Sequence, residues 1–202
     1  DLDKKLKTKT EVIYPSVNRQ RKRKKKKYIT FAGKLNSSKG YDLFKKSIIK
    51  ILDEFKDWKA FSIGDESRKR PHINHNRHTE VGFLKHKKVL DLLNKTEIAV
   101  VPSRWEEPFG RTALEASSRG CATIVSNRGG LPETSDFLIK LKELNSTNLY
   151  KEIKKLINNK LLRNKIQKLS AKNVKHIIST NTKIIDQIRS ECLPINKINF
   201  IK

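Results

Sequence analysis

Short apolar runs alternate with longer amphipathic segments between positions 27 and 138. The runs are rich in β-branched and aromatic residues and end at glycine, proline or polar residues, which is typical of buried strands. Five segments have this character: 27–33, 59–65, 79–84, 97–103 and 122–126. The segments between them predict helices, one opening at Tyr41, one from about His86 to Asn94 and one near Gly110. This alternation predicts an α/β fold, a parallel sheet with helices on both faces.

The two ends of the chain differ from this central region. The first block is polar and basic except for "EVIYPSV", which predicts a short strand or extended segment ended by Pro15. Beyond Leu138 the pattern is helical and basic and predicts extra C-terminal helices. We therefore expect a lead-in over 1–27, one domain over 28–176, and a terminal helix and tail over 177–202. Because the chain begins at Asp1 and contains no methionine, we expect it to be a piece of a larger protein.

The most unusual loops of the sequence all follow predicted strands. In a parallel sheet the carboxyl ends of the strands meet at one edge, and ligands bind in the crevice beyond that edge. Four loops are expected to gather there: "GKLNSSKG", "GDES", "PSRWEEPFG" and "SNRGGLPE". This shared edge is the strongest indication of a binding site.

The loop from Gly33 to Gly40 is suited to phosphate. Gly33 allows a sharp turn at the end of a strand, and Lys34 and Lys39 flank a small polar loop before a predicted helix. Ammonium groups and backbone N–H groups together can hold phosphate oxygens. The loop is not a Walker loop, and in so lysine-rich a chain two lysines near a glycine also arise by chance.

The loop "EEPFGRTALEA" combines two carboxylates with a helix N-terminus. The amides of Gly110, Arg111 and Thr112 are expected at the positive end of the helix dipole. Glu107 stays in the loop and Glu115 lies about one turn into the helix, so both can point toward one pocket. Carboxylates accept hydrogen bonds from hydroxyl groups, so a sugar nucleotide fits such a site. An exposed helix carrying two glutamates on its solvated face remains the alternative.

The net charge of +25 bears on possible partners. The 46 lysines and arginines are spread from end to end, and the densest run, at positions 19–27, has no interleaved aromatic residues for base stacking. We interpret this run as a solvated loop and do not expect nucleic acid as a partner. Peripheral contact with a polyanion or an anionic membrane surface stays open. No apolar run approaches the ~20 residues that cross a bilayer.

The cysteines and histidines do not predict a metal site. Cys121 and Cys192 match no zinc spacing, and the apolar surroundings of Cys121 predict a buried free thiol, which fits a reducing cytoplasm. His72, His75 and His78 recur at three-residue intervals but have no cysteine or paired carboxylate nearby. We interpret them as part of a surface loop and expect no metal.

Four segments carry a family resemblance in chain order: "FAGKLNSSKGYDLFKKSI", "FSIGDE", "VGFL" and "EIAVVPSRWEEPFGRTALEASSRGCATIVSNRGGLPET". They resemble the donor-binding half of GT-B glycosyltransferases, specifically family 4 (glycosyl transferases group 1). The resemblance runs from about Val12 to Thr134 and continues more loosely into the terminal helices. Its most specific parts are the two glutamates separated by seven residues and the later Gly-Gly-Leu-Pro-Glu. It implies a Rossmann-like domain that forms one half of a GT-B fold.

The resemblance assigns roles to individual positions. It implies that Glu107 contacts the hydroxyls of the donor sugar, that Glu115 holds the ribose hydroxyls, and that Lys39 contacts the donor pyrophosphate. Lys34 stands where an arginine is more usual, so a point charge replaces bidentate phosphate binding there. Further donor-binding groups are implied at Phe83 and Leu84, beside the nucleobase, and at the amides around Phe109, Gly110, Arg111 and Thr112.

The same resemblance implies a retaining, metal-independent transfer of sugar from a nucleotide diphosphate sugar to a glycan, lipid or lipopolysaccharide-type acceptor, without a cofactor. Lys34, Lys39 and the helix dipole would stabilise the leaving diphosphate. The family's acceptor-binding N-terminal domain is missing, so we expect this chain to be the C-terminal donor-binding half, inactive in transfer by itself. We expect a cytoplasmic protein or one peripheral to the inner face of a membrane. A basic polyanion- or membrane-binding module and a non-catalytic degenerate transferase domain remain alternatives.

Overall fold

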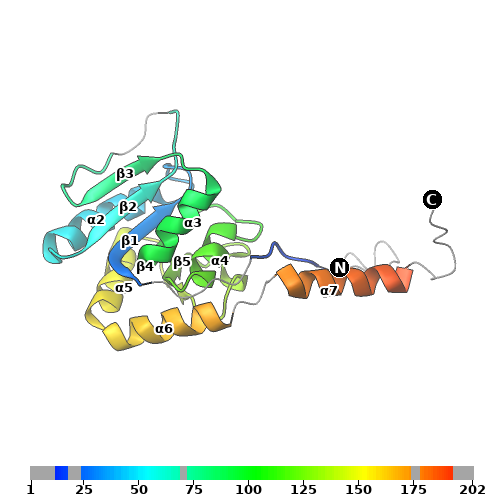
Figure 1. The fold of residues 1–202 in the computed structure, drawn as a ribbon. Helices are drawn as coiled ribbons and strands as arrows, with labels where there is room; N and C mark the ends of the chain where they lie inside the picture. The colour runs from blue at the N-terminus through cyan, green and yellow to red at the C-terminus, as the bar shows by residue number, and fades with distance from the viewer. Residues whose placement is uncertain (1–11, 18–23, 69–71, 174–177, 193–202) are drawn as a thin grey trace.

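The computed structural model describes residues 12–17, 24–68, 72–173 and 178–192 and is built around one six-stranded sheet (Figure 1). Neighbouring strands are parallel, and their order across the sheet is β3-β2-β1-β4-β5-β6. The strands are β1 (Lys26–Ala32), β2 (Lys59–Ile63), β3 (His78–Gly82), β4 (Thr96–Val101), β5 (Ala122–Val125) and β6 (Ile139–Lys140). This is the order of a doubly wound Rossmann-like sheet, in which the progress of the chain reverses between β1 and β4.

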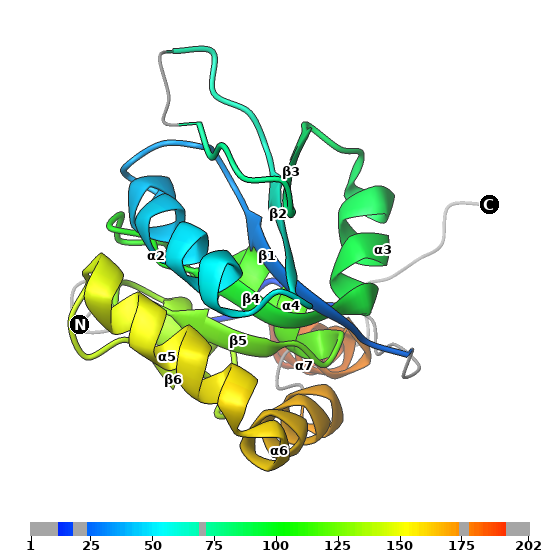
Figure 2. The same ribbon diagram turned by 90° about the vertical axis from the view of Figure 1, so that its left-hand side faces the viewer.

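Helices cover both faces of the sheet, as the sequence predicts. Figure 2 shows α2 and α5 on one face and α3 and α4 on the other. Helix α6 follows α5 and also contacts α4 and β5. The helices are α2 (Tyr41–Glu54), α3 (His86–Lys95), α4 (Arg111–Ser118), α5 (Ser146–Asn158), α6 (Lys160–Lys172) and α7 (Ile178–Cys192), with a short 3-10 helix η1 (Leu131–Glu133).

The alternation of side chains along β1 explains how one strand serves two helical layers. Ile29 and Phe31 are buried in the large core cluster, which includes residues of α2 and α5. Thr30 lies between them on the opposite face, where its hydroxyl is 2.7 Å from the hydroxyl of Thr96. The second face is closed by a smaller cluster that includes Leu93, Ala116 and Cys121. Both faces of the central strands are therefore buried.

Several local expectations are corrected by the structure. The region after Leu138 is not helical at once, because Ile139–Lys140 form β6, which is too short for a period-two pattern. The segment 12–17, expected to be a short strand or extended, has no regular secondary structure apart from one bridge at Val17, which is within that expectation. The basic run at 19–27 is not a solvated loop throughout. Positions 18–23 lie outside the described residues, but β1 begins at Lys26 and the Lys25 ammonium reaches backbone carbonyls in the interior.

The last helix lies apart from the body of the domain. Figure 1 shows α7 beyond the sheet and beside the segment 12–17. Asn181 Nδ2 donates a hydrogen bond of 2.6 Å to the carbonyl oxygen of Tyr14, and the Tyr14 ring stacks on Phe109 with the centroids 4.9 Å apart. The two segments that flank the domain in sequence therefore meet near the loop that carries Glu107. The predicted boundary at 176–177 lies outside the described residues.

Candidate active site at the β1–β4 switch point

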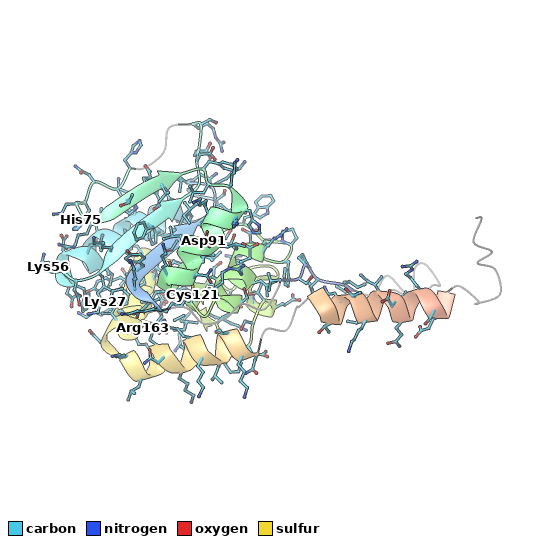
Figure 3. The ribbon with its side chains drawn as sticks, viewed as in Figure 1. Lys27, Lys56, His75, Asp91, Cys121 and Arg163 are labelled. Atoms are coloured by element: carbon cyan, nitrogen blue, oxygen red, sulfur yellow. The ribbon has the colours of Figure 1, made fainter. Side chains whose placement is uncertain are left out.

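A pocket of about 160 Å³ opens where β1 and β4 end. These adjacent strands mark the point at which the strand order reverses, the place where ligands bind in open α/β sheets. The ends of β1 and β4, the loops that follow them and the first turn of α4 line the pocket: Phe31, Ala32, Gly33, Lys39, Val101, Ser103, Glu107, Gly110, Arg111 and Thr112. In Figure 3 the labelled Lys27, Lys56 and His75 lie at the other side of the sheet, where the strands begin.

Lys39 and Glu107 face each other in this pocket. The Lys39 Nζ atom lies 2.5 Å from Glu107 Oε1, and both side chains are partly covered, with exposed fractions of 30% and 17%. Asn36 Oδ1 accepts a hydrogen bond of 3.1 Å from the backbone N–H of Lys39, which fixes the loop that carries the lysine. The pair is thus a cation and an anion held at one site by two different βα loops.

The two loops approach each other at a glycine. Gly40 has φ +74°, and a Cβ atom there would lie only 2.0 Å from the carbonyl oxygen of Pro102. The backbone N–H of Arg104 also donates to Ser38 O at 2.8 Å. Only glycine allows both this left-handed conformation and this approach of backbones. The sequence "KG" at 39–40 therefore places Lys39 against the loop after β4.

The N-terminus of α4 supplies amides to the same pocket. The first bonds of the helix run from Ala113 N and Leu114 N to Gly110 O, so the amides of Arg111 and Thr112 precede the helical ladder. Gly110 has φ +96°, and its missing side chain leaves room for Leu131 of η1. Unbonded amides at the positive end of a helix dipole favour an anion.

Glu115 does not line the pocket that holds Glu107. Its side chain is 7% exposed and lies between α3 and α4, where Oε1 is 2.7 Å from His86 Nε2 and 3.0 Å from Arg111 Nε. The expectation that both glutamates point into one pocket is therefore wrong for this pocket. Arg111 connects the two places, because it lines the pocket and also bonds Glu115.

The remaining predicted site residues differ in their surroundings. Gly33 lines the pocket, whereas Lys34 next to it is exposed. Phe109 is 5% exposed, its ring stacks on Tyr14, and it is not among the residues that line the pocket. Phe83 is 77% exposed. Leu84 lines a separate hollow of about 360 Å³ along α3, together with Lys88, Asp91, Leu92 and Lys95.

A pair of charged side chains links the loop after β4 to the first turn of α2. The Arg104 guanidinium makes two hydrogen bonds to the Asp42 carboxylate, of 2.6 and 2.8 Å. Burial acts to raise the pKa of Asp42, but the hydrogen bonds and charge of Arg104 outweigh it, and the pKa lies below its usual value. Trp105, the next residue in the same loop, is 59% exposed.

The loop after β2 is tied to the lysine loop. Arg68 and Asn36 both donate hydrogen bonds to the Glu66 carboxylate, which joins "GDES" to "GKLNSSKG". These bonds, from Arg68 first and Asn36 second, hold the pKa of Glu66 at about 2.

His86 is a site residue that the sequence reasoning did not identify. Its position could have been noticed, because it opens the helix that follows "VGFL", but its partner Glu115 is distant in sequence.

The spaced histidines are engaged separately. His72 lies beside Glu80, His75 beside Asp53, and His78 Nε2 is 2.8 Å from Ser62 Oγ. Within the described part of the chain, no group of three or more His, Cys, Asp or Glu side chains is arranged to hold a metal ion. Among the described helices, none has the length and apolar character required to span a membrane.

Comparison with known proteins places these features in a family. The family model described as glycosyl transferases group 1 matches residues 15–174. The chain belongs to this family. A curated relative of this group 1 glycosyltransferase chain is spore coat protein SA of Bacillus subtilis, which is 29% identical over 121 residues. That alignment covers 54% of the chain but 32% of the relative, so the chain spans about a third of the length of that protein.

Two solved structures share the fold of this group 1 glycosyltransferase chain. The Anabaena protein HepE, crystallised in complex with UDP-glucose, is 17% identical with a TM-score of 0.68, over 82% of this chain and 49% of that one. The C-terminal domain of the group 1 protein LpcC from Francisella tularensis is 23% identical with a TM-score of 0.62. That match covers 80% of this chain and 93% of the LpcC domain. At these identities the likeness establishes a GT-B type Rossmann-like fold.

Proposed function

We propose that this chain is the donor-binding half of a retaining, metal-independent family 4 glycosyltransferase that uses a nucleotide diphosphate sugar. One observation carries the proposal: Lys39, Glu107 and the amide end of α4 meet in one pocket at the β1–β4 switch point. The pocket offers positive charge and N–H groups for a diphosphate and a carboxylate for sugar hydroxyls. HepE, a protein of the same fold, was crystallised with UDP-glucose, which supports this class of ligand.

In the proposed reaction the bond between the sugar C1 atom and the diphosphate oxygen breaks, and the acceptor hydroxyl oxygen bonds to C1 on the same face. The acceptor proton passes to the departing phosphate oxygen. Lys39 and the amides of Arg111 and Thr112 stabilise the negative charge that develops on the diphosphate. Glu107 orients the sugar through its hydroxyls, and Glu115 holds the nucleoside. Lys34 adds positive charge at the pocket entrance.

The acceptor site belongs, in this proposal, to a separate N-terminal domain. The match to LpcC covers nearly all of a structure described as a C-terminal domain, and this supports the same position for the present chain. The chain alone would then bind the donor but not transfer sugar to a glycan, lipid or lipopolysaccharide-type acceptor. Addition of a matching N-terminal domain in the same polypeptide would restore transfer.

A second candidate is a module that binds polyanions or an anionic membrane, because the net charge is +25. Titration of a fluorescent nucleotide sugar, a DNA duplex and anionic vesicles across salt concentrations separates the two functions. The donor-site proposal expects saturable nucleotide-sugar binding that is weakened about tenfold in Glu115→Ala. Binding only to DNA or vesicles, falling steeply with salt, would contradict it. A folded chain that binds no nucleotide sugar would identify a degenerate domain.

A further inference from the structure

Glu115 is held by two donors that come from two different helices. His86 is the first residue of α3, and its Nε2 lies 2.7 Å from Glu115 Oε1. Arg111, one turn before Glu115 on α4, donates from Nε to the same oxygen at 3.0 Å. Within the described part of the chain, no hydrogen bond is made to the other carboxylate oxygen, Oε2. One oxygen is thus fixed, and the second is left to bind a ligand.

The contact adds little to the packing of α3 on α4. Those helices already meet through the apolar cluster that includes Leu93, Ala116 and Val89. The His86 side chain is 57% exposed and that of Arg111 is 64% exposed, and neither belongs to this apolar cluster. By contrast, the Glu115 side chain is 7% exposed, so the direction of its carboxylate depends on these two partners.

We propose that His86 is a positioning residue for the nucleoside end of the donor site. It holds the Glu115 carboxylate so that Oε2 can accept hydrogen bonds from the hydroxyl groups of a ribose. This inference rests on the proposed function and deepens it, because it makes His86 a determinant of the preference for a ribonucleotide over its 2′-deoxy counterpart. Arg111 gives the same carboxylate its second fixed contact, from the side of the diphosphate pocket.

The chemistry explains why histidine suits this position. An imidazole Nε2–H donates one directed hydrogen bond from a short, stiff side chain, and it does so whether the ring is neutral or charged. A lysine at position 86 would instead bring a flexible charged group that could bind the phosphates of the donor in place of Glu115. A glutamine can place its side-chain N–H at a similar distance, so it is the conservative replacement that tests the hydrogen bond itself.

The experiment compares ribonucleotides with 2′-deoxynucleotides. Calorimetry of the wild-type chain with UDP, GDP and ADP identifies the diphosphate that binds, and its 2′-deoxy counterpart is then titrated under the same conditions. The variants are His86→Ala, His86→Gln and Glu115→Ala. The matched control is His72→Ala, which removes an exposed histidine that lies 3.4 Å from a glutamate and lines neither pocket. Melting temperatures establish that each variant is folded.

The wild-type chain is expected to bind the ribonucleotide about tenfold more tightly than the deoxynucleotide, the value of one hydrogen bond to a charged group. His86→Ala is expected to remove most of that preference by weakening ribonucleotide binding alone. His86→Gln should restore it, Glu115→Ala should abolish it, and His72→Ala should leave it intact. This pattern cannot arise from a general loss of structure, since that would weaken both ligands equally.

Three outcomes overturn the inference while leaving the proposed function in place. In the first, His86→Ala keeps the wild-type preference although Glu115→Ala loses it. In the second, His86→Ala weakens the binding of both nucleotides by the same factor. In the third, His86→Gln behaves like His86→Ala. A wild-type chain that binds none of the three diphosphates overturns the proposed function and this inference with it. If His86→Ala does not fold, the comparison of His86→Gln with wild type decides, because loss of the preference in that variant also overturns the inference.

Discussion

Lys39 Nζ lies 2.5 Å from Glu107 Oε1 and so joins the loop after β1 to the loop after β4. The opposite charges of the two groups neutralise each other in the pocket, which the first residues of α4 also line. A diphosphate that enters the pocket would therefore compete with Glu107 for the lysine, while the sugar would bring hydroxyl groups to the carboxylate. In the proposed complex the diphosphate would therefore lie beside Lys39 and the sugar beside Glu107.

Changes to the two partners should therefore have opposite effects on a nucleoside diphosphate. Lys39→Ala removes the cation and leaves the Glu107 charge in the pocket, so affinity should fall by about tenfold or more. Glu107→Gln leaves the lysine without a competing carboxylate, so affinity should be unchanged or higher. Calorimetry with the bound diphosphate measures both, and the exposed Lys50→Ala provides a control. A fall of equal size in both variants would contradict this account of the pair.

The same variants differ in their response to the sugar. Glu107→Gln should lose the difference in affinity between the nucleotide sugar and the bare diphosphate, because the carboxylate is the proposed partner of the sugar hydroxyls. Lys39→Ala should retain that difference while binding both ligands less tightly. The comparison needs only two more titrations. If Glu107→Gln discriminates as the wild type does, Glu107 does not contact the sugar.

Gly40 and Gly82 have nearly the same backbone conformation but different surroundings. Replacing each by alanine therefore distinguishes the cost of steric overlap from the cost of conformational strain. Gly40 and Gly82 have φ values of +74° and +73°, but a Cβ at Gly40 would meet Pro102 O at 2.0 Å, whereas a Cβ at Gly82 would meet nothing within 4 Å. Gly82→Ala should cost about 1–2 kcal/mol from the left-handed backbone alone. Gly40→Ala should cost clearly more, about 3 kcal/mol or greater, because backbone atoms must move. Urea denaturation measures the free energy of unfolding of both variants. Equal losses of stability would show that the loop after β1 and the loop after β4 separate easily.

Much of this site could be predicted from the sequence because it depends on periodicity. The apolar runs ending at Gly33 and Pro102 predict strands, and parallel strands bring the loops that follow them to one edge. That reasoning placed Lys39 and Glu107 on the same rim, although the two are far apart in the chain. It required no knowledge of side-chain conformation. The amides near Gly110 could be predicted in the same way, because the sequence indicates that a helix begins there.

Other features depend on side-chain contacts that periodicity does not encode. Glu115 turns toward His86 because α3 packs beside α4, and no local sequence pattern indicates that the two residues are neighbours. Lys25 looks like one more member of a basic run, yet its ammonium reaches the carbonyl oxygens of Leu93 and Arg119. The exposure of Trp105 likewise depends on the path of one loop. In each case the surroundings of the side chain are set by the tertiary arrangement and not by the local sequence.

Lys25 should therefore contribute to stability in a way that its neighbours do not. Its Nζ donates to Arg119 O at 2.7 Å and to Leu93 O at 3.1 Å, and it lies 3.7 Å from the sulfur of the buried Cys121, labelled in Figure 3. Burial lowers the pKa of the Lys25 ammonium. Lys25→Met keeps the apolar stem but leaves both carbonyls without this donor, so it should destabilise the fold by about 1–3 kcal/mol.

The matched control for Lys25 is Lys24→Met, since Lys24 is the exposed neighbour. It should change the free energy of unfolding by no more than about 0.5 kcal/mol, as substitutions on the surface usually do. Urea denaturation of both variants gives the comparison. Equal stability of the two variants would mean that the Lys25 ammonium is solvated and not bonded to the carbonyls.

The loop contact at Glu66 predicts a dependence on pH. The pKa of Glu66 is held at about 2 by Arg68 first and Asn36 second, below its ordinary value of 4.5. Because the folded-state pKa is depressed, the stabilisation from Glu66 is fully present above pH 4.5 and is lost as the pH falls from 4.5 toward 2. A carbon-detected NMR titration of the Glu66 carboxyl should show a midpoint near 2.

Arg68→Ala removes the larger of the two causes and should raise the pKa of Glu66 toward its ordinary value. Asn36→Ala should raise it less, and it should also loosen the loop, because Asn36 bonds the backbone of Lys39. A midpoint that does not move in Arg68→Ala would mean that the guanidinium does not hold the carboxylate in solution.

The most direct test of the central claim is a titration of the ¹⁵N-labelled chain with UDP-glucose, GDP-mannose and ADP-glucose, in buffer that contains EDTA, followed by amide chemical shifts. The account predicts that at least one nucleotide sugar causes saturable shifts centred on the amides of Gly33, Lys39, Gly110, Arg111 and Thr112. Shifts confined to other surfaces, or no shifts with any of the three ligands, would contradict a metal-independent donor site at the β1–β4 switch point.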